Sequence, residues 1–339
     1  MADLGFPDEP SSGHVEVDRQ ATENDSVYGD ELSNYTTSLT SSVYNYRREN
    51  GRTYHGYQDG EYLFPNDEDE SDRLDIVHEM TLTMMGRRLY LAPIGSSPRR
   101  VVDLGTGTGI WPIEFGDQHP SAEVLGVDLS PTQPSLVPPN VRFLVDDIEK
   151  PWLYSQAFDF VHVRGLACCV KDYANLIRQA YDNTAPGQWV EFQDWDTNLV
   201  SEDGSTNNTF LEQYYNVVLG SFQKAGYVNR PGLHLEQWLR DTGFENVHVR
   251  KYPVPLGTWP KDKHLKKVGA WNFLQAESGF ESAAMAVLTR NEGWSRDEVT
   301  VLVAKARQDV KNREIHSLFY FYVAYGQKPG KSSSVDTSH

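Results

Sequence analysis

The sequence predicts an α/β fold built on a doubly wound, mostly parallel β-sheet. From Arg100 onward, short apolar runs alternate with helical stretches, which is the pattern of successive βαβ units. The apolar runs are nearly continuous, as expected when helices cover both faces of a parallel sheet. The chain has 339 residues, of which 39% are hydrophobic and 12% aromatic, so it holds enough apolar material for a sizeable core.

The charge balance excludes several classes of protein. The net charge is 31 − 48 = −17, whereas nucleic-acid binding draws its affinity from lysine and arginine. No apolar stretch approaches the roughly 20 residues that span a bilayer, and no secretory signal is recognised. The two cysteines, Cys168 and Cys169, are too few for a zinc site. We therefore expect an intracellular protein, nuclear or cytoplasmic, without metal or direct nucleic-acid binding.

Composition divides the chain into four segments. Residues 1–42 hold nine acidic residues and one basic residue, with few apolar side chains, and we predict a disordered acidic tail. Residues 330–339 form a second predicted disordered tail. Between the tails we expect an aromatic and helical cap over 43–98 and the sheet domain over 99–329. A helical insertion is expected at about 258–313, before the last strand.

The cap combines tyrosines with a helical pattern. Tyr54, Tyr57 and Tyr62 are expected either to fold over a bound ligand or to seal the N-terminal side of the domain. Apolar residues with one buried face predict a helix over about 71–90, ended by Pro93 and the residues after it.

The sheet domain is predicted element by element. Helices are expected from about Ile110, over about 173–183 and within the insertion, where Ser295 and Glu298 form a capping box. The predicted strands cover about 101–104, 123–128, 141–145, 158–163, 188–193, 247–254 and 318–325.

A glycine-rich loop follows the first of these strands. It runs from Asp103 to Gly109 as DLGTGTG, and its glycines let a ligand approach the backbone closely. The helix behind it would direct its N-terminal amides toward the ligand. A nicotinamide fingerprint is G-x-G-x-x-G with a glycine at position 110, but Ile110 stands there. The spacing favours a nucleoside ligand without a pyrophosphate over a dinucleotide.

Acidic residues follow the next two strands. Asp128 ends the second strand, where a carboxylate can accept both ribose hydroxyls, although an aspartate there can also cap a helix. After the third strand, Asp147 can accept from an adenine amine, and Ile148 can offer its backbone amide. Because the carboxyl ends of these strands share one edge of the sheet, we expect one ligand crevice.

These motifs resemble the class I S-adenosylmethionine-dependent methyltransferases. The resemblance implies a seven-stranded sheet with an antiparallel last strand, and S-adenosylmethionine as cofactor. A narrower resemblance to the fungal LaeA-like methyltransferases rests on YHGYQDGEYLFPNDEDESDRLDIVHEM at 54–80, GTGIW at 107–111, and LGTWPKDKHLKKVG with GWSRDEV across 256–299. The residues predicted to bind the cofactor are Asp103, Gly105, Thr106, Gly107, Gly109, Asp128, Leu129, Asp147, Ile148 and Arg164.

Few catalytic side chains are expected, because methyl transfer from a sulfonium mainly needs two aligned reactants. The weak candidates are Arg164, His162 and Glu191. Arg164 would contact the methionine carboxylate or the acceptor, or form a structural ion pair. His162 is expected to be packed in the sheet more often than to act as a base. Trp111 would wall the cofactor cleft or lie in the core.

The sequence leaves three alternative functions open. The resemblance favours a LaeA-like regulator of secondary metabolism and development, acting in transcription regulation through a velvet-type protein or a second methyltransferase subunit. The alternative is a tailoring methyltransferase that acts on a small fungal metabolite, with an acceptor enclosed by the aromatic cap and insertion. A non-catalytic interaction module is a third class, and the intact glycine loop argues against it.

Overall fold

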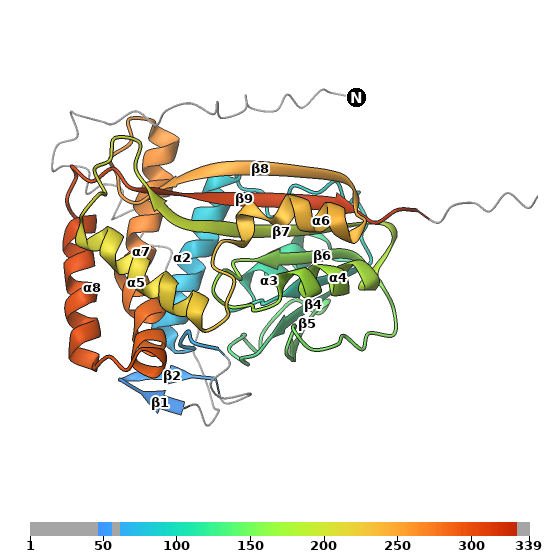
Figure 1. Cartoon of the computed structure of the whole chain (residues 1–339). Helices are drawn as coiled ribbons and strands as arrows, with labels where there is room; N and C mark the ends of the chain where they lie inside the picture. Colours follow the sequence, from blue (N-terminus) through green and yellow to red (C-terminus); the bar gives the residue numbers. More distant parts are fainter. Residues whose placement is uncertain (1–46, 56–61, 331–339) are drawn as a thin grey trace, which may run out of the picture.

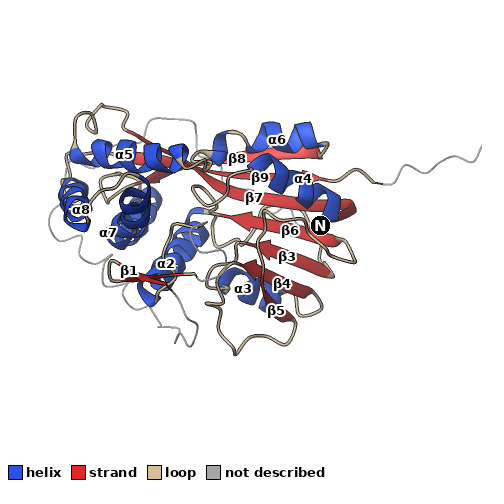
Figure 2. Ribbon diagram, turned by 60° about the horizontal axis from the view of Figure 1, so that its bottom comes forward, coloured by secondary structure: helices blue, strands red, loops and turns tan. Residues whose placement is uncertain are grey.

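The computed structural model describes residues 47–55 and 62–330. The predicted N-terminal tail, Tyr57 and most of the predicted C-terminal tail lie outside the described residues. Seven strands form one mixed sheet in the order β5-β4-β3-β6-β7-β9-β8 (Figure 1). Figure 2 shows these strands side by side, with a group of helices beyond one end of the sheet.

All seven predicted strands are confirmed. Strands β3 to β7 run parallel, and β9 lies antiparallel between β7 and β8, as expected for a sheet closed by its last strand. The fifth strand, β7, is much longer than predicted. The strands are β3 (Arg100–Leu104), β4 (Glu123–Asp128), β5 (Val141–Val145), β6 (Phe158–Arg164), β7 (Thr184–Val200), β8 (Glu245–Pro255) and β9 (Leu318–Gln327).

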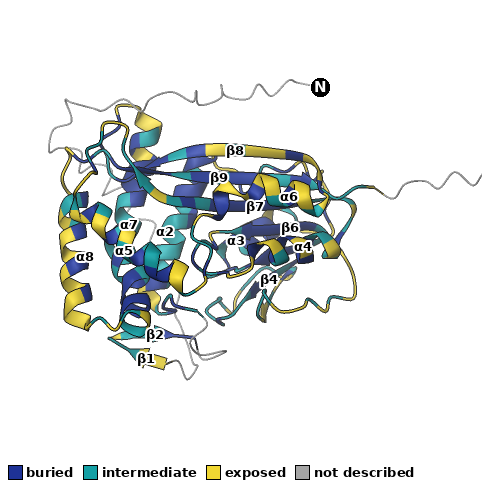
Figure 3. Ribbon diagram, in the orientation of Figure 1, coloured by how far each residue is buried: buried dark blue, intermediate teal, exposed yellow. Residues whose placement is uncertain are grey.

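Helices cover both faces of the sheet. On one face, α4 (Tyr173–Asn183) and α6 (Leu235–Thr242) pack on the side that carries Val102 and Val161. On the other, α3 (Ile110–Gln118) packs on the side that carries Val101. The neighbouring residues Val101 and Val102 belong to different clusters because side chains alternate along a strand. Figure 3 shows the central strands buried and the outer side of α8 exposed.

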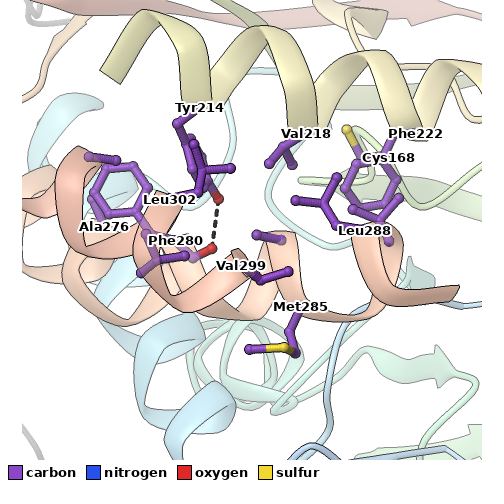
Figure 4. Packing of buried hydrophobic residues seen from close by; sticks show 14 of the residues in the cluster. Cys168, Tyr214, Val218, Phe222, Ala276, Phe280, Met285, Leu288, Val299 and Leu302 are labelled. Atoms are coloured by element: carbon purple, nitrogen blue, oxygen red, sulfur yellow. Dashed lines mark hydrogen bonds between the residues drawn. The ribbon is translucent and has the colours of Figure 1, made fainter. Parts of the chain in front are cut away.

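A second layer of helices stands at the end of the sheet. It consists of α5 (Phe210–Lys224), α7 (Lys263–Asn291) and α8 (Arg296–Val310), which share one apolar core (Figure 4). The capping box of α8 is formed by Ser295 and Glu298, as the sequence predicts. Within the described part of the chain, no helix is both long and apolar enough to cross a membrane.

The cap joins this helical layer to the sheet. Its hairpin, β1 (Arg47–Glu49) and β2 (Arg52–Tyr54), is held by Arg290 of α7, which contacts Glu49 at 2.8 Å and lies 4.6 Å above the ring of Tyr54. Arg52 forms two 2.6 Å hydrogen bonds to Asp67, the N-cap of the next helix.

That helix, α2, spans Glu68–Met84 and packs against α7. The predicted bounds of 71–90 were therefore wrong at both ends. The helix starts early because the side chain of Asp67 accepts the Glu70 N–H. It ends early because Gly86 and Arg87 both adopt φ 63°, which no helix continues.

We predict that the two N-terminal segments contribute very differently to stability. Removing 1–42 leaves every contact described above in place, so the melting temperature and the affinity for S-adenosylmethionine should stay nearly unchanged. Removing 1–90 deletes α2 and its buried Met80, Leu82 and Met84. At about 1.5–3 kcal/mol per buried side chain, this loss approaches the roughly 5–15 kcal/mol that stabilise a typical domain.

Melting temperature and cofactor dissociation constant of both truncated proteins are the measurements. If removal of 1–42 alone abolished cofactor binding, the acidic segment would belong to the site and the predicted boundary would be wrong.

Candidate functional site

A cavity of about 260 Å³ lies where the carboxyl ends of β3, β6 and β7 meet α2, α5 and α7. One wall is the glycine loop and the residues after β6, and the opposite wall is aromatic. The loop side is lined by Asp103, Gly105, Thr106, Gly107, Thr108, Ile110, Arg164, Gly165, Ala167, Cys168 and Cys169. A cofactor on the loop and a second molecule against the aromatic wall would therefore share one space.

Three positions of the glycine loop favour glycine. Gly105, Gly107 and Gly109 have φ of 70°, 58° and 81°, in the left-handed region that side chains rarely adopt. A Cβ on Gly105 would stand 2.5 Å from Leu166, and one on Gly109 would stand 2.5 Å from Phe143. The loop therefore packs closely on neighbouring side chains at Gly105 and Gly109, and its other side faces the cavity.

Asp103 links the loop to the sheet. Its Oδ2 accepts the Thr106 hydroxyl at 2.6 Å, and its Oδ1 lies 2.6 Å from Nδ1 of His162. His162 is fully buried and stacks on Trp111 at 3.8 Å between ring centroids, and neither ring lines the cavity. The structure thus places His162 as a support for Asp103 and Trp111 in the core, away from any acceptor.

Asp128 holds the loop from its other side. Its Oδ2 accepts the Gly107 N–H at 2.8 Å, and its Oδ1 accepts the Ser130 N–H at 2.9 Å. Burial raises the pKa of Asp128 to about 6, while these N–H groups lower it. No helix follows in the described chain between β4 and β5, so the helix-cap alternative was wrong.

The acidic residues that follow β5 lie next to Asp128, because β5 and β4 are neighbours in the strand order. The backbone N–H of Asp146 donates to the carbonyl of Asp128 at 3.0 Å. The carboxylate of Asp147 accepts the Glu149 N–H at 2.9 Å. Of the residues predicted to bind the cofactor, Gly109, Asp128, Leu129, Asp147 and Ile148 are outside the cavity lining. The structure brings the three elements to one sheet edge, and the cavity extends from the loop toward the helices.

Arg164 lines the cavity at the end of β6. One terminal nitrogen, Nη2, lies 2.8 Å from Nδ1 of His78. The other, Nη1, is buried and has no hydrogen-bond partner in the described part of the chain. A buried guanidinium N–H without an acceptor fits an anionic group of a bound ligand. Together with the glycine loop, this orphaned donor shows that the residues present suit S-adenosylmethionine.

Glu191, the third catalytic candidate, lies away from the cavity. Its carboxylate is fully buried and accepts the N–H groups of Leu91 and Ala92 at 2.7 and 2.6 Å, and the side-chain amide of Gln193 at 2.7 Å. Burial raises its pKa to about 7. The structure gives Glu191 the role of fastening the segment after α2 to the middle of the sheet.

The aromatic wall of the cavity was not predicted as such. Tyr214 of α5 points at α7 and donates to the carbonyl of Phe280 at 2.7 Å (Figure 4). Of the insertion aromatics, only Phe280 lines the cavity. The wall consists of Tyr62, Phe64, Trp195, Tyr214, Tyr215, Phe222, Phe280 and Phe319.

We did not predict α5, the helix that supplies three of these rings, from the sequence. The sequence does contain the usual signals of a helix there. Thr209 and Glu212 have the spacing of a helix start, and Thr209 caps the Glu212 N–H in the structure. Apolar residues then recur at helical spacing from Leu211 to Phe222. In the described residues, no group of three or more potential ligands could hold a metal ion.

We predict that Gly107→Val abolishes binding of S-adenosylmethionine and leaves the protein folded. The new side chain meets Leu74 at 3.3 Å and occupies the open side of the loop. Gly95→Val is the matched control, because Gly95 has φ 76° and open space around it. Titration calorimetry on both folded variants gives the result, and unchanged affinity in Gly107→Val would refute the placement of the cofactor.

We predict that Asp128→Ala weakens cofactor binding by roughly 2–4 kcal/mol, the usual range for charge-assisted hydrogen bonds. Ribose hydroxyls donate to the ionised carboxylate, so binding favours loss of its proton. Affinity of the unaltered protein should therefore fall as pH drops through about 6, and this dependence should vanish in the variant. A loss below about 0.5 kcal/mol would mean that Asp128 only shapes the turn.

The comparisons with known proteins agree with this geometry. The family model described as "Methyltransferase domain" matches residues 76–249. The chain is 38% identical to the methyltransferase pytC of Aspergillus terreus, over 97% of this chain and 100% of that protein.

Two regulators are also similar. The secondary metabolism regulator LAE1 of Cochliobolus heterostrophus is 34% identical, over 83% of this chain and 94% of its own length. The protein-methionine methyltransferase laeA of Emericella nidulans is 33% identical, over 84% of this chain and 77% of its own length. The chain belongs to the methyltransferase domain family, close to the LaeA-like proteins, and is an enzyme whose methyl donor is S-adenosylmethionine.

Proposed function

We propose that the protein transfers a methyl group to a small, largely apolar organic molecule, as a tailoring enzyme of fungal secondary metabolism. The observation that carries the proposal is the cavity itself. The glycine loop and the aromatic wall line one continuous space, so an acceptor packed on the rings lies beside the cofactor. The aromatic rings suit a molecule with little charge.

The protein contributes to the reaction by aligning the two reactants and by excluding water. S-adenosylmethionine supplies an electrophilic methyl group on a sulfonium. Alignment of the two reactants by the protein can provide on the order of 7–11 kcal/mol. Tyr215 lies 6.2 Å from Phe280 and 5.0 Å from Phe319 between ring centroids, and these rings exclude water from the acceptor.

The relatives support this choice over the regulatory one. Identity and coverage are both higher for pytC than for the regulators. The second candidate is a LaeA-like regulator that works with protein partners in the nucleus. The similarity to LAE1 over 83% of this chain favours it, and its acceptor would be a protein side chain.

Filling the aromatic side of the cavity tests the proposal. Ala283 of α7 lines the cavity, whereas Ala304 of α8 is exposed. We predict that Ala283→Phe lowers turnover of a small acceptor at least tenfold and leaves cofactor affinity within about twofold, because the new ring takes the acceptor's space. Ala304→Phe should change neither.

The assay incubates the protein with S-adenosylmethionine and a panel of apolar phenols, enols and carboxylic acids, and detects products by their mass gain of one methylene. A methionine-containing peptide is the comparison substrate. Methylation of the peptide with no product from the panel would contradict the proposal and support the regulatory function.

A further inference from the structure

Three side chains form a row from α3 through α2 to the end of β6. Nη2 of Arg164 lies 2.8 Å from Nδ1 of His78, and Nε2 of His78 lies 3.3 Å from Oε2 of Glu114. The side chain of His78 is 0% exposed. The row therefore leads from the surface-facing carboxylate of Glu114 to the guanidinium that lines the cavity.

The hydrogen-bonding chemistry of these three side chains determines the tautomer of His78. A guanidinium can only donate, so Nδ1 of His78 must accept. The imidazole proton then sits on Nε2, which lies 3.3 Å from the Glu114 carboxylate and makes no hydrogen bond within the described residues. Burial lowers the pKa of His78, and the nearby charge of Arg164 lowers it further. A neutral imidazole held in this tautomer gives Arg164 one defined orientation.

Arg164 lines the cavity and has one unused donor. Its Nη1 is buried without a hydrogen-bond partner in the described residues. The carboxylates of Asp75, Asp103 and Glu114 act on Arg164 through space, and burial lowers its pKa because the charge is costly to desolvate. An anion arriving in the cavity would satisfy the donor and offset that cost.

We propose that His78, which lies 3.3 Å from Glu114 and 2.8 Å from Arg164, is a positioning residue that orients Arg164 to bind the carboxylate of the methyl donor. The cavity supports this assignment, because Arg164 lines the same cavity as the glycine loop. The inference rests on the methyl donor and is independent of the acceptor.

Two ligands that differ only around the carboxylate test the proposal. Dissociation constants are measured by calorimetry for S-adenosylmethionine and for decarboxylated S-adenosylmethionine. We expect Arg164→Met to weaken the first about 10- to 100-fold, the usual worth of a hydrogen bond to a charged group, and to change the second less than threefold. His78→Leu should show the same selectivity with a loss of about 5- to 20-fold.

Two further variants separate positioning from packing. His78→Asn keeps an acceptor near the position of Nδ1 and should recover most of the affinity that His78→Leu loses. Arg178→Met removes an exposed arginine of α4, paired with Asp182 at 3.3 Å, and should change neither dissociation constant. All variants are checked for an unchanged melting transition.

Equal losses for both ligands, or failure of His78→Asn to recover affinity, would show that the row only supports the fold and would overturn the proposal. No loss in Arg164→Met would do the same. Methylation of the peptide with no product from the panel would refute the proposed tailoring function and leave these affinities as expected, so the two failures are distinguishable.

Discussion

The site depends on the hydrogen bonds that two carboxylates make to the glycine loop. Asp103 holds the loop through the Thr106 hydroxyl, and Asp128 holds it through the Gly107 N–H, both within 2.8 Å. Three left-handed glycines would be free to take many shapes. Anchored at two points to neighbouring strands, they take one shape, and their open side becomes a wall of the cavity.

The rest of the cavity exists because a helical layer closes over that wall. The sheet alone would offer an open crevice at its carboxyl edge, as parallel sheets do. Here α5 and α7 stand at that edge and contribute aromatic rings, and α2 packs against α7. The cap hairpin is fastened to α7 by Arg290, so the N-terminal segment and the insertion stabilise each other. Cofactor site and acceptor space are therefore products of one packing arrangement.

The sequence predicted the sheet well because each strand is a local pattern. Every strand of the seven-stranded sheet and the loop after β3 could be placed from apolar runs and glycines, whereas the short strands β1 and β2 were not predicted. The long-range contacts could not. His78 lies within the predicted cap, and only the approach of α2 to the end of β6 places it 2.8 Å from Arg164. Glu191 was expected near the end of a strand beside the site, but β7 runs on to Val200, and the Glu191 carboxylate accepts the backbone N–H groups of Leu91 and Ala92. Strand-end position alone does not say toward which face a side chain points.

A crystal structure of the protein with bound S-adenosylhomocysteine tests the account most directly. The account predicts the adenosine over the loop between Gly105 and Gly109, with both ribose hydroxyls on Asp128. It predicts the carboxylate on Arg164 and the sulfur facing an open aromatic chamber between α5 and α7. A ligand whose sulfur faced away from that chamber, or a chamber closed by its own side chains in the complex, would contradict it.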